Sequence, residues 1–176
     1  MIEIREIDAA HQADINLPNE AFPIYGRLVP ALAEGQWSHR IELFPAEDVT
    51  EMTFPDEAYD YADMIGNHAF LGAYDGETCV GLAILEGAWF KYMYLMDLKV
   101  CASHRGQGVA AALVDEARKI ARAHGYRGLY TIGQDNNLNA CKFYLKYGFE
   151  IGGFDNRVYR GTPQEGKADI LFYIEG

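Results

Sequence analysis

The segment that offers the clearest chemistry is Ser103 to Ala110, which reads Ser-His-Arg-Gly-Gln-Gly-Val-Ala. Its glycines, Gly106 and Gly108, would let backbone N–H groups approach a ligand closely, and the helix predicted to follow would begin with an anion-binding end. Arg105 could hold a phosphate with two hydrogen bonds. The segment therefore suits a pyrophosphate, and a plain turn before a helix is an equally good interpretation of it.

A dinucleotide-binding loop is a competing interpretation, because Gly106, Gly108 and Ala111 fit the pattern G-x-G-x-x-G/A. Two features count against it. Four residues, Ala102 to Arg105, separate the first glycine from the preceding strand. The acidic residue expected about 20 positions later is also missing, since Asp135 follows Gly106 by 29 residues.

The elements around this loop follow from the periodicity of apolar residues. One helix is predicted to begin after Asp8, its N-cap. Two more are predicted over Gln107 to His124 and over Asn137 to Tyr147. Strands are predicted over Ile2 to Ile7, Ala69 to Tyr74, Thr78 to Leu85, Tyr92 to Cys101, Gly128 to Gln134, Phe149 to Phe154 and Ala168 to Ile174. Strict alternation would place Leu95, Asp97, Lys99 and Cys101 on one face of the strand Tyr92 to Cys101.

These elements predict a mixed sheet. Short turns make the first hairpins antiparallel, whereas the unit from Tyr92 to Gln134 fits a parallel crossover. Between Pro18 and Pro55, repeated prolines interrupt every periodicity, which favours short helices or loops. That region could cover a substrate or form an irregular structural lobe.

The length and charge narrow the classes of function. A chain of 176 residues with 49% apolar residues predicts a single globular domain over residues 1–176. The net charge of −11 argues against nucleic acid and favours cationic partners. The longest apolar run, Cys79 to Leu85, is too short to cross a membrane, and no signal peptide is evident, so a cytoplasmic protein is expected.

The acidic stretch Asp56 to Asp63 is expected to be a solvated face or a site for a polycation. No metal-ligand spacing is found among the histidines.

Two motifs together resemble the GNAT acetyltransferases. Arg105-x-x-Gly108-x-Ala110 after a strand resembles the acetyl-CoA loop of that family, and Asn137-x-x-Ala140-x-x-x-Tyr144-x-x-x-Gly148-Phe149 resembles its C-terminal helix motif. The stretch from Gln134 to Tyr144 and the aromatic residues after it are similar to the streptothricin acetyltransferases. The resemblance implies a GNAT fold of the α/β (α+β) class, with a mixed, mostly antiparallel sheet of about six to seven strands and helices on both faces.

The resemblance also implies roles for individual residues. Leu98, Lys99 and Val100 would offer backbone groups to the acetyl and pantetheine arm of acetyl-CoA, the acetyl-donating co-substrate. The pyrophosphate would lie against Arg105, Gly106, Gln107, Gly108, Val109 and Ala110. Asn137 would contact the pantetheine, and the phenol of Tyr144, also near the cofactor, would protonate the leaving sulfur. No metal is expected, a homodimer is common in the family, and antibiotic resistance is the implied role.

The sequence departs from the family pattern at the general base. Glutamates common in the family are replaced by Met96 and Ile132. Asp97 is the nearest carboxylate on the strand, and it could be the base, acting directly or through water, or a structural acid paired with Lys99. Catalysis without a dedicated base is the third alternative.

We therefore expect an N-acetyltransferase that acts on a primary amine of a small cationic substrate, with a streptothricin-type antibiotic as the first candidate. The alternatives are an acetyltransferase for protein or peptide amines, and a noncatalytic acyl-CoA-binding module. The missing glutamates at positions 96 and 132 motivate the noncatalytic alternative.

Overall fold

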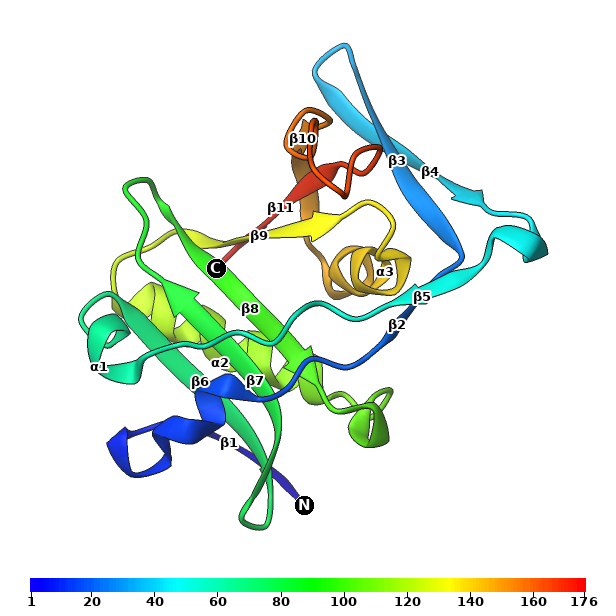
Figure 1. Cartoon of the computed structure of the whole chain (residues 1–176). Helices are drawn as coiled ribbons and strands as arrows, with labels where there is room; N and C mark the ends of the chain where they lie inside the picture. Colours follow the sequence, from blue (N-terminus) through cyan, green and yellow to red (C-terminus); the bar gives the residue numbers. More distant parts are fainter. The chain divides into compact units, whose positions relative to one another are not determined.

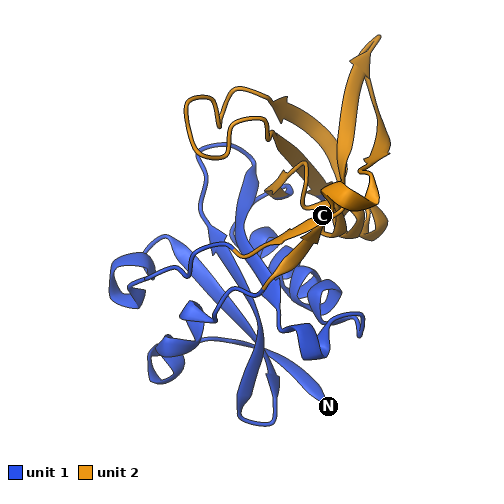
Figure 2. Ribbon diagram, turned by 45° about the vertical axis from the view of Figure 1, so that its right-hand side comes forward, with its two compact units in different colours: residues 1–20, 54–129, 175–176 blue, residues 21–53, 130–174 orange.

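The computed structural model describes residues 1–176, which form two compact units (Figure 2). Unit 1 comprises residues 1–20, 54–129 and 175–176, and unit 2 comprises residues 21–53 and 130–174. Neither unit is one continuous stretch, because the chain passes four times from one to the other.

The strands of unit 1 follow the order β1-β6-β7-β8, and each neighbouring pair is antiparallel (Figure 1). Their bounds are Ile2–Glu6 for β1, His68–Asp75 for β6, Thr78–Glu86 for β7 and Tyr92–Val100 for β8. β6 and β7 are the predicted hairpin, and Gly76 supplies the positive φ of 62° in its turn.

Helix α2 (Val109–Ala123) covers one face of these four strands. The helix buries the apolar stripe predicted from the sequence, including Leu113 and Ala117. Gly81 of β7 permits its close approach, because a Cβ at that position would lie 3.2 Å from Leu113 and 3.3 Å from Val109.

The other face is covered by the 3-10 helix η1 (Ala9–Asn16) and by residues around the short helix α1 (Tyr61–Met64). Asp8 is the N-cap of η1, as predicted, and accepts a 3.1 Å hydrogen bond from the N–H of His11. Five residues form the buried core here: Ile7, Ile15, Phe70, Leu82 and Ile84. Helices therefore lie on both faces of the unit 1 strands.

In unit 2 the structure corrects one prediction. The region from Pro18 to Pro55 was expected to hold short helices or loops, yet β3 (Gly26–Ala33) and β4 (Gln36–Leu43) form a regular antiparallel hairpin. Two shorter strands, β2 (Phe22–Ile24) and β5 (Thr50–Met52), pair with each other, and a single 3-10 turn, η2 (Ala46–Asp48), precedes β5. Prolines are tolerated because each of these sheets has only two strands, in which an N–H can face outward.

The rest of unit 2 follows the predicted order of elements. Strand β9 (Gly128–Gln134) begins in unit 1 and is followed by α3 (Leu138–Tyr147), β10 (Glu150–Asp155) and β11 (Asp169–Glu175). The strand order in this unit is β9-β11-β10. The predicted fold class is confirmed. None of the helices combines the length and the apolar character needed to cross a membrane.

Candidate active site

Strand β8 carries an extra residue beside the candidate base. Ile84 of β7 pairs with Asp97. The next residue, Leu85, pairs with Leu95, so Met96 has no partner in the ladder and forms a β-bulge. Paired residues share a face, so Asp97 and Leu95 point to opposite faces. The prediction that Leu95 shares the face of Asp97 is wrong, because strict alternation allows for no extra residue.

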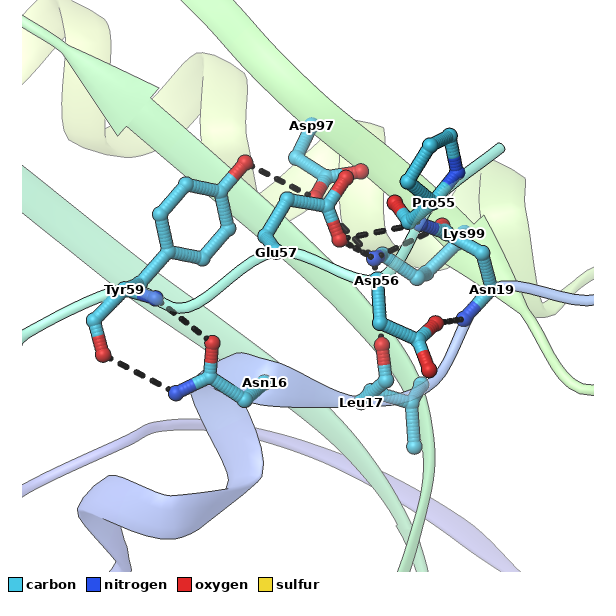
Figure 3. A network of polar contacts seen from close by, with 9 residues as sticks. All are labelled: Asn16, Leu17, Asn19, Pro55, Asp56, Glu57, Tyr59, Asp97 and Lys99. Carbon is cyan, nitrogen blue, oxygen red and sulfur yellow. Dashed lines mark hydrogen bonds and ion pairs between the residues drawn. The ribbon is translucent and has the colours of Figure 1, made fainter.

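Lys99 shares the face of Asp97, and its ammonium group is enclosed by acceptors (Figure 3). The Nζ atom lies 3.1 Å from the Leu17 carbonyl oxygen, 2.9 Å from Asn19 Oδ1, 3.0 Å from Glu57 Oε2 and 3.2 Å from Asp97 Oδ2. An ammonium has three hydrogens to donate, so this network uses all of them. The Lys99 ammonium therefore forms all of its hydrogen bonds within the protein. Only the backbone of Lys99 could bind a ligand.

Asp97 is a buried carboxylate with two polar neighbours in this network. The hydroxyl of Tyr59 donates to Asp97 Oδ2 over 3.4 Å, and Lys99 lies on the same oxygen. Burial raises the pKa of Asp97, and the positive charge of Lys99 only partly opposes that effect. Burial, followed by the charge of Asp97, also raises the pKa of Tyr59, which keeps its hydroxyl a donor. A raised pKa suits a general base, and the ion pair with Lys99 suits a structural acid.

The acidic stretch Asp56 to Asp63 is largely used within the fold. Asp56 accepts a 2.7 Å hydrogen bond from the N–H of Asn19, and Asp60 caps α1. Burial acts to raise the pKa of Glu57, but hydrogen bonds from Lys99 and Asn19 outweigh it and lower the pKa. Asp56 and Glu57 thus attach the segment after Pro55 to Asn19, and Glu57 also attaches it to Lys99 of β8 (Figure 3). Asp56, Asp60 and Asp63 are exposed, as expected for a solvated face, whereas Glu57 is half-buried.

The predicted anion loop follows β8 through a 3-10 turn, η3 (Ala102–His104). Arg105 is anchored at one end, where its Nε donates to the carbonyl of Val100 over 2.9 Å. Its guanidinium also lies 3.5 Å from Glu20 Oε2, and the Arg105 side chain is 44% exposed. The structure thus fixes the direction of the guanidinium and leaves its outer edge accessible to solvent.

The two loop glycines adopt a conformation that other residues rarely take. Gly106 has φ 73° and Gly108 has φ 82°, and no atom lies within 4 Å of where a Cβ would be at either position. Gly108 is the N-cap of α2, and the first helical hydrogen bond runs from the N–H of Ala112 to the Gly108 carbonyl. The N–H groups of residues 109–111, which include Val109 and Ala110, have no acceptor within the helix. Gln107 reaches back to the Ser103 carbonyl over 3.1 Å.

The neighbouring residues of β8 point away from the polar network. Leu98 pairs with Ala83 and Val100 pairs with Gly81, so both face α2. The backbone of residues 98–100 thus separates the face of α2 from the face of Lys99.

In unit 2, Asn137 is the N-cap of α3. Its side-chain oxygen accepts a 3.4 Å hydrogen bond from the N–H of Ala140, and its side-chain amide donates to no group of the chain. The same residue can therefore cap the helix and still donate to a ligand.

Tyr144 lies two turns further along α3 and is 7% exposed. Its ring packs against Phe172, at 5.1 Å between centroids, and against Phe149, at 5.4 Å. The aromatic packing fixes the direction of the phenol.

The two positions at which the family resemblance leads us to expect glutamates are structurally different. Met96 is the bulged residue of β8 and packs with the unit 1 core, whereas Ile132 lies on β9 and is 39% exposed. Asp97, directly after the bulge, is the carboxylate that β8 provides.

The structure divides the predicted site residues between the two units. Unit 1 brings Asp97, Lys99 and the loop from Arg105 to Ala110 to the end of β8 and the start of α2, and unit 2 holds Asn137 and Tyr144 on α3. Sequence reasoning missed Tyr59 and Glu20. They could not be predicted from a motif, because Tyr59 lies 38 residues from its partner Asp97 and Glu20 lies 85 residues from its partner Arg105.

Comparisons with known proteins agree with these motifs. The acetyltransferase (GNAT) family matches residues 32–149. Streptothricin acetyltransferase A of Bacillus subtilis (strain 168) is 31% identical over 172 residues, covering 98% of this chain and 99% of that protein. A streptothricin acetyltransferase of Escherichia coli is 32% identical over 105 residues, or 60% of each chain. A solved structure, assigned as a streptothricin acetyltransferase from Bacillus anthracis str. Ames in complex with acetyl coenzyme A, has a TM-score of 0.89 with 27% identity over 100% of both chains.

Proposed function

Because the chain belongs to the acetyltransferase (GNAT) family, we propose that it transfers the acetyl group of acetyl-CoA to a primary amine of a small cationic molecule, with a streptothricin-type antibiotic as the first candidate. The observation that carries the choice of substrate is the similarity to streptothricin acetyltransferase A over 98% of the chain. Antibiotic resistance is then the implied biological role.

The loop at the start of α2 supports a role for unit 1 in holding the acetyl donor. In this proposal the backbone from Gly106 to Ala110 and the exposed edge of Arg105 bind the pyrophosphate. The backbone of Leu98, Lys99 and Val100 binds the acetyl and pantetheine arm, and the free amide of Asn137 donates to the pantetheine.

Proton transfer is assigned to two side chains. Tyr144 gives its phenolic proton to the thiolate of coenzyme A as the thioester bond breaks. Asp97 takes a proton from the attacking amine, directly or through water, and its raised pKa supports that role. A base is needed because an ordinary lysine-like amine has a pKa of about 10.4, so fewer than about one molecule in a thousand is neutral at pH 7.

The charge of the protein supports a cationic acceptor. The net charge of −11 attracts an ammonium-bearing molecule before it reacts. We also propose that both units belong to one acetyltransferase domain over residues 1–176, because neither is continuous in sequence and the family match includes residues of both. A cytoplasmic location, a homodimer and the exclusion of nucleic acid and membranes as partners stay predictions from the sequence.

The decisive experiment measures release of coenzyme A thiol from acetyl-CoA with a streptothricin-class antibiotic, polyamines, aminoglycosides and lysine-bearing peptides. We expect a strong preference for the antibiotic, and mass spectrometry should place one acetyl group on a primary amine. Turnover with peptides alone would favour the protein or peptide acetyltransferase. Tight binding of acetyl-CoA without turnover on any amine would favour the noncatalytic module suggested by Met96 and Ile132.

A further inference from the structure

Unit 2 contains a pocket that has no part in the proposed acetyl transfer. It has a volume of about 270 Å³, and its lining includes Arg27, Val29, Asp135, Phe154, Asn156 and Lys167. These residues come from β3, from the ends of β9 and β10, and from the segment before β11. The volume is close to the lower end of the range for ligand sites, which suits one small molecule.

Backbone hydrogen bonds through Asp135 hold the walls of the pocket together. The N–H of Leu28 donates to the carbonyl of Asp135 over 3.0 Å, and the N–H of Asp135 donates to that of Ala168 over 2.9 Å. The N–H of Ala168 returns a 3.2 Å hydrogen bond to Asp135 Oδ1. The pocket is therefore preformed at this side.

Lys167 is the cation in the lining that lacks a countercharge. Its Nζ contacts only neutral acceptors, Gln164 Oε1 at 3.0 Å and Met52 Sδ at 3.3 Å, and no carboxylate lies within 4.0 Å. An ammonium has three hydrogens, so one remains to be donated. A half-buried charge is stabilised when an opposite charge joins it.

Arg27 and Asp135 are the other charged groups of the lining. The guanidinium of Arg27 pairs with Glu42 at 3.0 Å, and Asp135 is 5% exposed with an oxygen bonded to Ala168. Burial raises the pKa of Asp135. Arg27 Nε is shielded from solvent and has no acceptor.

The remaining lining offers apolar contact beside these donors. Phe154 is 41% exposed. Val29 also lines the pocket, and it lies on β3 together with Arg27. The side-chain amide of Asn156 forms no hydrogen bond within the chain. We propose that this pocket binds the carboxylate of a small molecule with an apolar body, with Lys167 as its main charged contact.

This site differs chemically from the one proposed for the acceptor amine. The ammonium of Lys167 would repel an ammonium group of a ligand, and none of the residues that line this pocket has a role in holding acetyl-CoA. The inference therefore does not depend on the identity of the amine substrate.

Benzoate is the probe, because it joins a carboxylate to a planar apolar ring. Two-dimensional amide NMR of the full chain would follow Gly166, Lys167 and Ala168 during titration with benzoate, with benzylamine and with uncharged benzamide. We expect saturable shifts of these amides with benzoate, weaker shifts with benzamide and none with benzylamine.

Three variants test the contact. Lys167→Met should weaken benzoate binding about tenfold or more, and Lys167→Arg should restore most of it. Lys142→Met is the matched control, because it removes a lysine of the same unit that does not line the pocket, and it should bind benzoate like the natural chain. Absence of saturable shifts with benzoate, or unchanged binding in a folded Lys167→Met variant, would overturn the proposal. Neither result would bear on acetyl transfer, which is measured separately by thiol release.

Discussion

The ammonium of Lys99 lies 3.2 Å from the carboxylate of Asp97, on one face of β8, and the two side chains are only 12% and 14% exposed. The same ammonium lies 3.0 Å from Glu57. Two carboxylates thus depend on one cation, and Lys99 connects β8 to the segment that carries Glu57 and Tyr59. The arrangement makes Lys99 a structural requirement for any role of Asp97 in catalysis.

Replacing Lys99 should therefore destabilise the protein strongly. Lys99→Met keeps the apolar stem but leaves Asp97 and Glu57 without their shared cation, which should lower the free energy of unfolding by about 3 kcal/mol. Urea unfolding measures this change.

The matched control is Lys119→Met, which removes a lysine that pairs with Glu116 at the surface and is 62% exposed. Its effect should stay below about 1 kcal/mol. In the double variant Lys99→Met with Asp97→Asn, the loss should be smaller than the sum of the single losses. An additive result would contradict the proposed dependence of Asp97 on Lys99.

The pH profile of acetyl transfer should report the base. Burial raises the pKa of Asp97 above its ordinary 3.8. As the pH is lowered, Asp97 is therefore protonated at a pH where exposed aspartates are still ionised, and kcat/KM falls there. Activity should rise as the pH increases through this raised pKa. The Asp97→Asn variant should have lower activity and no such step, whereas the rise at high pH from deprotonation of the amine itself should persist. An unchanged acid limb in Asp97→Asn would remove Asp97 as the base.

Elements with local signals could be predicted from the sequence, and contacts between distant segments could not. The glycine loop before α2 could be predicted because Arg105, Gly106 and Gly108 lie within four residues of sequence. The helix that carries Asn137 and Tyr144 could be predicted, and their roles are those that the family resemblance implies. The bulge at Met96 was missed, because strict alternation was assumed along the strand and the sequence does not show which residue lacks a partner across the ladder.

The prolines of the region before Pro55 do not prevent strand formation. Pro30 lies within β3, and Pro23 lies within β2, where two-stranded pairing leaves room for a residue without an N–H. The acceptors of Lys99 were also out of reach, because Asn19 lies 80 residues before it and no pattern relates the two.

The loop glycines provide a prediction with a closely matched control. Gly108 and Gly125 sit at the two ends of α2 with nearly equal φ angles of 82° and 81°, and both have open space where a Cβ would be. An alanine at either position should cost about 1 kcal/mol of stability, because the left-handed conformation is strained for any residue with a Cβ.

Only Gly108→Ala should also weaken binding of acetyl-CoA, since the added Cβ stands beside the N–H groups proposed to hold the pyrophosphate. Calorimetric titration of both variants would test this. Equal affinity in Gly108→Ala and Gly125→Ala would show that the loop does not hold the donor.

The role of Tyr144 can be separated from its packing. Tyr144→Phe keeps the ring that contacts Phe149 and Phe172 and removes only the hydroxyl, so the fold should be retained. Without the acid, coenzyme A must leave as an unprotonated thiolate, and kcat should fall by about a hundredfold or more while acetyl-CoA affinity changes little. Tyr147→Phe, on the same helix and with its ring 5.8 Å from that of Phe149, is the control and should keep its activity. Steady-state kinetics with the amine found by thiol release would test this role. A rate in Tyr144→Phe equal to that of the natural chain would show that Tyr144 is not the acid and that water protonates the sulfur.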